Sequence, residues 1–258
     1  MKHCLPLLAI LLSFQVICSG QNRLPANSRK KQTQHTLKNI EQLLDKQKSG
    51  WELVMQWKKE ANNKVEILPK DSKKAETALY HTQVSTRSPM SAIIYETGGI
   101  LVDDGWLRIL GSGSERLSRS LPEWNKGKAF DAYGEQPSFL LVADDVLGGF
   151  FAINGGGINK NEIGNIFYFA PDNLKWESTG LDYSNFIIFC FSGAISKFYE
   201  GLRWNNWQQD VKNIQGDKGI LCDPLLYTKE GQNINRVNRK LVPVQELWNM
   251  YFNVSKEK

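Results

Sequence analysis

The sequence is short of the residues that most often build metal centres and hydrolytic triads. It has 3 histidines and 4 cysteines among 258 residues. His3 lies in the apolar N-terminal stretch, and His35 and His81 are far apart along the chain. The chain therefore has too few histidines for a histidine-based zinc site or a Ser-His-Asp triad. We predict no metal and no cofactor.

Long apolar runs are absent beyond the N-terminus. The stretch 1–20 has Lys2, an apolar run beginning at Leu5, and small residues at Ser19 and Gly20. This order is typical of a secretory signal peptide and is too short for a membrane span. We predict a signal peptide over 1–20 and an exported, periplasmic or secreted protein with no transmembrane segment in the mature chain. A lipid on Cys18 is the less favoured alternative, because Ile17 before it is bulky.

Linkers and internal repeats are also absent, so we predict a flexible N-terminal segment over 21–35 and a single domain over 36–254. The formal net charge is only +5. The basic runs at 29–31 and 236–240 carry no interleaved aromatic residues. We therefore predict no nucleic-acid partner. Cys190 and Cys222 are the two cysteines left after residue 20, and the sequence leaves open whether they form a disulfide or stay as buried thiols.

The densest apolar runs lie between Pro137 and Trp176, where glycine, asparagine and aspartate break them at short intervals. We expect an antiparallel meander with strands over 139–142, 150–153 and 165–170. Gly148 and Gly149 suit the hairpin between the first two strands. The three glycines after Asn154 suit a sharp reversal. Another hairpin is expected from 100–102 and 106–110.

Helical periodicity and caps surround this sheet. Before it, helices are predicted over 36–47, 49–61, 71–83 and 89–97. After it, a helix over 183–201 interrupted at Ser192-Gly193, a second over 204–211 and a last one over 243–253 are expected. The fold class is therefore α+β, with an antiparallel meander covered on one face by N- and C-terminal helices.

Two stretches, TRSPMSAIIYETGGILVDDGWLRILGSGSERLSRSLPEWN (86–125) and FLLVADDVLGGFFAINGGG (139–157), resemble the bacterial family of unknown function DUF2625 over roughly 36–228. The resemblance brings no catalytic residues with it. More distantly, 142–157 is similar to the Smi1/Knr4-like superfamily of cell-wall regulators and toxin-immunity proteins. That similarity implies a protein-binding module, often one that neutralises a toxin, although such proteins are usually cytoplasmic.

Six residues are candidates for a binding site. Arg116, Trp124 and Asn125 lie in the long segment 111–136, and long ordered loops tend to carry function. Trp124 has no periodic apolar partner, so we expect it at the surface. Asp144 and Asp145 end a strand, where they act as an acid pair or as a turn entry. Asn154 begins the glycine turn, which either cradles a ligand or simply reverses the chain.

The function predicted is that of an exported, non-enzymatic protein-binding module, in its narrower form immunity-like. Its partner face would combine the segment 111–136 with the turns at Asp144-Asp145 and Asn154. The alternative is a protein that binds cell-envelope saccharide, or an enzyme that acts on it with Asp144 or Asp145 as acid/base. A structural envelope protein is a third hypothesis.

Overall fold

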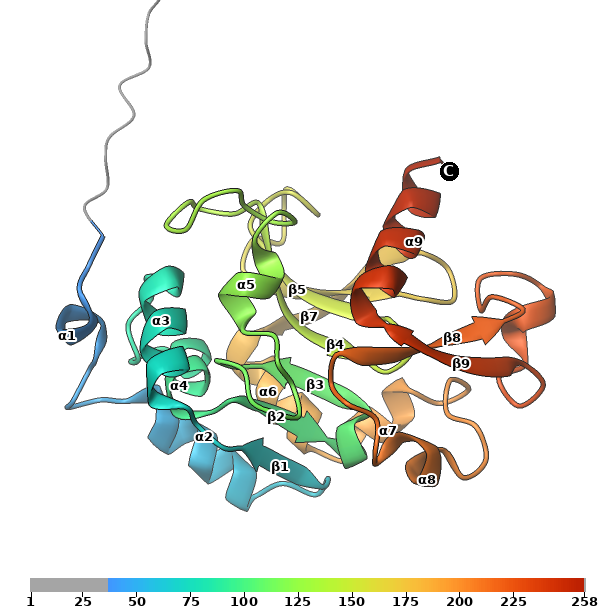
Figure 1. Cartoon of the computed structure of the whole chain (residues 1–258), viewed down its shortest axis with the longest axis horizontal. Helices are drawn as coiled ribbons and strands as arrows, with labels where there is room; N and C mark the ends of the chain where they lie inside the picture. The colour runs from blue at the N-terminus through green and yellow to red at the C-terminus, as the bar shows by residue number, and fades with distance from the viewer. Residues whose placement is uncertain (1–36, 258) are drawn as a thin grey trace, which may run out of the picture. The chain divides into compact units, whose positions relative to one another are not determined.

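The structure is a computed structural model that describes residues 37–257, and the predicted signal peptide lies outside them. These residues form an α+β unit built on a seven-stranded sheet (Figure 1). The strands run in chain order, and every neighbouring pair is antiparallel. They are β1 (Val65–Leu68), β2 (Gly99–Val102), β3 (Leu107–Leu110), β4 (Phe139–Asp145), β5 (Phe150–Asn154), β6 (Asn165–Ala170) and β7 (Lys175–Asp182). The predicted fold class and meander are confirmed.

Side-chain caps set the starts of several helices. Ser49 caps α2, Asp71 caps α3 and Asp182 caps α6, each by accepting a hydrogen bond from a backbone N–H of the first turn. The helices are α1 (Ile40–Leu43), α2 (Gly50–Lys59), α3 (Ser72–Thr82), α4 (Pro89–Glu96), α5 (Leu121–Asn125), α6 (Tyr183–Phe191), α7 (Ala194–Phe198), α8 (Trp207–Val211) and α9 (Val244–Glu257), with 3-10 turns η1 (Asp103–Gly105) and η2 (Glu230–Gln232). The predicted break at Ser192-Gly193 is confirmed between α6 and α7.

Helices cover both faces of the sheet, not one as predicted. Successive residues of a strand point to opposite faces. On β5, the Phe150 ring packs on Trp248 of α9 and Trp124 of α5, whereas Phe151 packs on Phe186 of α6. Figure 1 accordingly shows α5 and α9 on one side of the sheet and α6 on the other. Every residue of β2 and β3 is buried, as expected of central strands enclosed on both sides.

A second, two-stranded sheet was not predicted. It pairs β8 (Lys218–Asp223) with β9 (Asn238–Pro243), and neither stretch was predicted to be a strand. The Ile220 N–H donates to the Val146 carbonyl at 2.6 Å, which ties β8 to the β4–β5 turn. The strand β1 was also missed. Four-residue strands carry too few alternations to be distinguished from loop by pattern alone.

The first helix and the 111–136 segment also differ from expectation. The helix predicted over 36–47 is the single turn α1, because Asn39 and Gln42 form a capping box there and Leu44 is already extended. Within 111–136, Ser120 and Glu123 form another capping box that starts α5. Trp124 therefore belongs to a short helix that packs into the core, and its side chain is 5% exposed. The prediction of a surface Trp124 is wrong.

The hairpin at the centre of the sheet is built as expected. Gly148 has φ +80°, and β4 pairs with β5 on either side of the turn. Cys190 and Cys222 are both buried and free, so the disulfide does not form in this structure. No helix among residues 37–257 is long and apolar enough to cross a membrane.

Candidate functional site

Asp144 lies in the middle of the sheet, between two arginines. Its carboxylate is fully buried and accepts from Arg108 Nε at 2.6 Å and from Arg119 NH1 at 2.6 Å. Arg108 stands directly opposite it on β3. Opposite charges facing each other across neighbouring strands reinforce the register. Both carboxylate oxygens of Asp144 are therefore engaged by protein groups.

The two arginines carry the network away from the sheet. Arg108 also donates to the Lys218 carbonyl at 2.7 Å and to the Asp145 carbonyl at 2.6 Å. Arg119 donates to the Asp217 carboxylate at 2.9 Å and to the Gly216 carbonyl at 2.6 Å. Strands β3 and β4, the segment before α5 and the start of β8 are thus held together by one set of charge-assisted hydrogen bonds.

Asp145 is fully buried and makes no ion pair among the described residues. One of its oxygens accepts from the N–H groups of Leu147 and Gly149, each at 2.9 Å. The other accepts from the hydroxyls of Tyr168 at 2.7 Å and Tyr199 at 3.2 Å. Burial raises the pKa of Asp145 above its ordinary value, although these hydrogen bonds oppose the shift. This carboxyl closes the β4–β5 turn and anchors α7 through Tyr199, the residue after it.

The acid pair therefore faces the interior. Neither carboxylate has a free oxygen or an exposed surface with which to meet a substrate. A general acid or base must come within hydrogen-bond distance of the proton that it transfers. In this conformation the geometry of Asp144 and Asp145 fits a structural function.

The two asparagines among the candidates are also buried. Asn125 exchanges a pair of hydrogen bonds with the backbone of Leu141, at 2.7 and 2.8 Å, where β4 bulges away from its neighbour. Asn154 accepts from the N–H groups of Gly156, Ile158 and Asn159, and so organises the loop that follows β5. Both side chains satisfy backbone groups that the ladder leaves unpaired.

Arg116 and Trp124 are the last two predicted site residues, and they contact different partners. Arg116 is half-buried and donates to both carboxylate oxygens of Glu66, at 2.6 and 2.7 Å. Trp124 lies between Arg119, 4.5 Å from its ring centroid, and Lys128, at 3.8 Å. Burial, and then the charge of Arg119, lower the pKa of Lys128 to about 8. Arg119, Trp124 and Lys128 border an open hollow of about 550 Å³ next to the start of α9.

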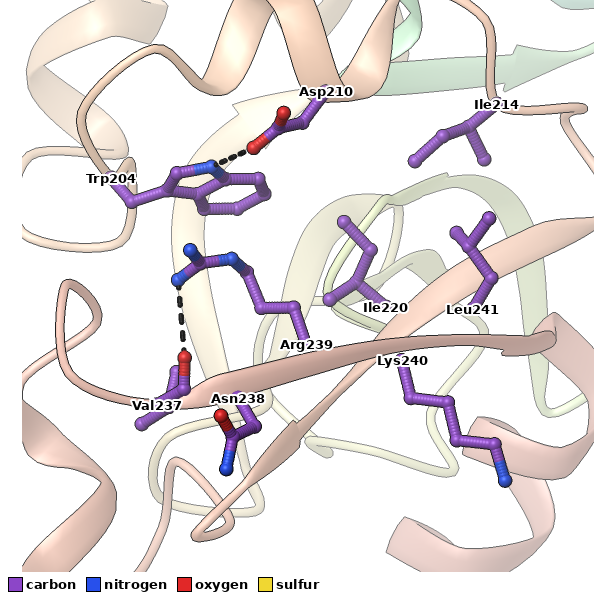
Figure 2. Close-up of a pocket in the computed structure, with 9 residues that line it drawn as sticks. All are labelled: Trp204, Asp210, Ile214, Ile220, Val237, Asn238, Arg239, Lys240 and Leu241. Atoms are coloured by element: carbon purple, nitrogen blue, oxygen red, sulfur yellow. Dashed lines mark hydrogen bonds between the residues drawn. The ribbon is translucent and has the colours of Figure 1, made fainter.

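A second hollow of about 340 Å³ lies between α8 and the β8–β9 sheet (Figure 2). At one end the Arg239 guanidinium stacks on the Trp204 indole, 4.7 Å from its centroid, and the indole N–H donates to Asp210 at 2.7 Å. At the other end Ile214, Ile220 and Leu241 form an apolar wall. Leu241 is 55% exposed and is the most exposed apolar side chain of this wall. We call this hollow the β9 pocket.

None of the six predicted residues borders the β9 pocket. The pocket needs strands β8 and β9, and those strands were missed. One signal was present, because Ile220-Leu221-Cys222 is an apolar run bounded by Gly219 and Pro224. For a metal, the described residues contain no cluster of three or more His, Cys, Asp or Glu side chains that could hold one.

The sheet, its helices and the two hollows define an α+β domain built around a buried ion-pair network. The chain belongs to the family described as protein of unknown function DUF2625, whose model matches residues 40–247. A Haemophilus influenzae relative named as an uncharacterized protein is 46% identical over 188 residues, covering 73% of this chain and 82% of the relative. The Escherichia coli putative uncharacterized protein YbfG is 39% identical over 216 residues, covering 84% and 96%. No solved structure matches the chain, and the Smi1/Knr4-like similarity stays a prediction.

Proposed function

We propose that this protein is a non-catalytic module that is exported and binds another protein through the β9 pocket. The observation that carries the proposal is the exposed side chain of Leu241 at the edge of an apolar wall, beside two cations, Arg239 and Lys240, that make no ion pair among residues 37–257. Exposed apolar surface rimmed by polar groups is typical of protein interaction sites. A partner would cover the leucine and place negative charge beside Lys240.

The alternative, an enzyme acting on envelope saccharide, receives less support from the geometry. Asp144 and Asp145 are buried and fully hydrogen-bonded, as described above. Trp124, which was expected at the surface, is 5% exposed, and its ring already contacts Arg119 and Lys128. A stacking platform must offer an open ring face, and Trp124 offers none.

The immunity-like form of the proposal makes the partner a toxin. It rests on the similarity of 142–157 to the Smi1/Knr4 pattern. In this chain that hairpin is enclosed between α9 and α6, since Phe150 and Phe151 pack on one helix each. A toxin would therefore be bound at the sheet margin, where the β9 pocket opens.

The test is affinity capture of a partner from envelope extracts, followed by binary binding measurements with the purified partner. Three forms of the mature protein are compared: wild type, Leu241→Asp and Ile163→Asp. Ile163 is the matched control, because it is an exposed apolar residue, 67% exposed, in the loop after β5. We expect Leu241→Asp to lose the partner and Ile163→Asp to keep it. Equal binding by all three, or binding of a glycan array with no protein captured, would overturn the proposal.

A further inference from the structure

The strand β9 has one neighbour and therefore one free edge. In the two-stranded sheet it pairs with β8 alone. The outer side of β8, by contrast, is joined to the β4–β5 turn through the bond from Ile220 to Val146. A free edge presents unpaired N–H and C=O groups, on which another strand can form.

The register shows which groups those are. In an antiparallel ladder, opposite residues either exchange both of their hydrogen bonds or both point away from each other. Ile220 gives its N–H to Val146, so the pair Ile220↔Leu241 is of the second kind. The backbone N–H and C=O of Leu241, and of Arg239 two residues earlier, therefore point outward from β9. Pro243, which has no N–H to donate, occupies the next outward position, as expected at an edge.

These outward backbone groups have no hydrogen-bond partner within residues 37–257. They lie at the mouth of the β9 pocket. Side chains alternate along the strand, so those of Leu241 and Arg239 point to the face that carries Ile220, and that of Lys240 points to the other, although Lys240 also borders the pocket. Figure 2 shows the Lys240 side chain directed away from the apolar wall.

We propose that β9 accepts an additional strand from the protein partner: an extended segment in which apolar and acidic side chains alternate. The apolar side chains fall beside Leu241 and enter the pocket against Ile214 and Ile220, while the acidic side chains fall beside Lys240. Main-chain hydrogen bonds to Leu241 and Arg239 supply affinity, and the pocket supplies selectivity. This inference rests on the proposed function and specifies its binding mode.

The β7 edge of the main sheet offers no equivalent. At β7 the pairing with β6 shifts register, and Gly180 has φ +69°. Irregularities of this kind twist an edge away from regular pairing. The exposed positions along β7 are mainly polar or charged, with Lys175, Glu177 and Ser178 among them.

The first arm of the test uses proline as a backbone probe. Leu241→Pro removes an outward N–H, and Leu241→Ala removes only the side chain. The ligand is a synthetic eight-residue peptide that alternates glutamate and valine, titrated into the full mature chain. We expect Leu241→Pro to bind about tenfold more weakly than Leu241→Ala, since a lost hydrogen bond and a steric block act together. Lys240→Pro is the folding control: its N–H belongs to the β8–β9 ladder, so this variant should melt at a lower temperature, and Leu241→Pro should not.

The second arm leaves the protein unchanged and methylates the peptide backbone. Methylating the valine nitrogens should abolish binding if the added strand is antiparallel to β9, and methylating the glutamate nitrogens should abolish it if the strand is parallel. In either case the other peptide still binds. Equal binding by both methylated peptides, or no binding of the unmethylated peptide to wild type at millimolar concentration, would overturn strand addition.

The two proposals fail in different ways. A captured partner that is lost in Leu241→Asp but binds Leu241→Pro as well as Leu241→Ala would leave the binding function standing and remove strand addition. A peptide that binds with the expected methylation pattern, in a protein that captures no partner from the envelope, would show the edge to be competent and contradict the proposed function.

Discussion

Asp144 neutralises the buried Arg108 and the largely buried Arg119, whose guanidinium groups have few other anionic contacts. Arg108 is 1% exposed and has Asp144 as its one ion-pair partner in the described chain. A buried charge without its counter-ion costs far more than an exposed one, because water no longer solvates it. Asp144 is therefore a structural residue, and its replacement should lower the free energy of unfolding.

We expect Asp144→Asn to lower the free energy of unfolding by about 3 to 5 kcal/mol, because it leaves a charge uncompensated in the interior. Urea denaturation monitored by circular dichroism measures the change. The matched control is Glu66→Gln, which breaks the exposed ion pair with Arg116 and should cost only about 0 to 1 kcal/mol. Equal, small losses in both variants would contradict the buried network.

Asp145 makes a separate prediction, because its stability contribution depends on pH. Burial raises its pKa in the folded protein above the ordinary value of 3.8. The folded state therefore holds this proton more tightly than the unfolded state. Wild type should lose stability relative to Asp145→Asn as pH rises above about 3.8, until the carboxyl is ionised in the folded state as well. Denaturation of both proteins from pH 3 to 8 would test the sign, and a difference that grows in favour of wild type would refute it.

For single residues, the sequence identifies which ones matter, but it does not predict which side chains contact them. Asp144 and Asp145 stand out at a strand end, yet the partners that bury them, Arg119 and Tyr199, come from segments 25 and 54 residues away. Nothing in local spacing predicts that these side chains converge. Trp124 was misplaced for a related reason, since a five-residue helix offers no periodic apolar face to detect.

At the scale of elements, the β4–β5 turn shows how two adjacent glycines differ. Gly148 has φ +80°, which is costly for any residue with a Cβ. Gly149 has no such conformation, but a Cβ there would run into the Asp145 carboxylate and the Tyr168 hydroxyl. Gly148 is needed because of its positive φ, and Gly149 is needed because no space is left for a side chain.

Both Gly148→Val and Gly149→Val should therefore unfold at lower temperature. Strain at Gly148 costs about 1 to 3 kcal/mol. Gly149→Val should be at least as damaging, because the groups it meets are held by buried hydrogen bonds. Gly193→Val is the matched control, since its added Cβ meets nothing within 4 Å. Thermal unfolding followed by circular dichroism decides the matter, and wild-type melting of both hairpin variants would show the turn to be tolerant.

Elements with strong local signals were predictable, and those defined by distant partners were not. The helices α2, α3 and α4 begin at the start signals Ser49, Asp71 and Pro89. The strands β4 to β6 alternate with glycine turns that fix their ends. The pair β8–β9 has no such turn: 14 residues separate its strands, and long-range pairing leaves little trace in local sequence.

At the scale of the whole molecule, the ion-pair network and the β9 pocket meet at the start of β8. The Arg108 guanidinium holds the Lys218 carbonyl, and Arg119 holds Gly216 and Asp217 just before it. The position of the β8–β9 sheet thus depends on charges buried in the main sheet. The position of the free edge of β9 depends on the same charges. These contacts fix the position of the edge that we propose for binding.

Export is the prediction that belongs to the entire chain. The stretch 1–20 lies outside the described residues, so the argument rests on its sequence: one lysine, an apolar run, then Ser19 and Gly20. Intact-mass spectrometry of the protein made in a bacterial host should find a chain that begins at Gln21. A variant with Leu11→Arg, which breaks the apolar run, should keep Met1 and remain inside the cell. Cys18→Ala separates a soluble product from a lipoprotein, because lipid attachment needs that thiol and ordinary cleavage does not. An unprocessed wild type, or processing that stops in Cys18→Ala, would contradict a soluble exported module.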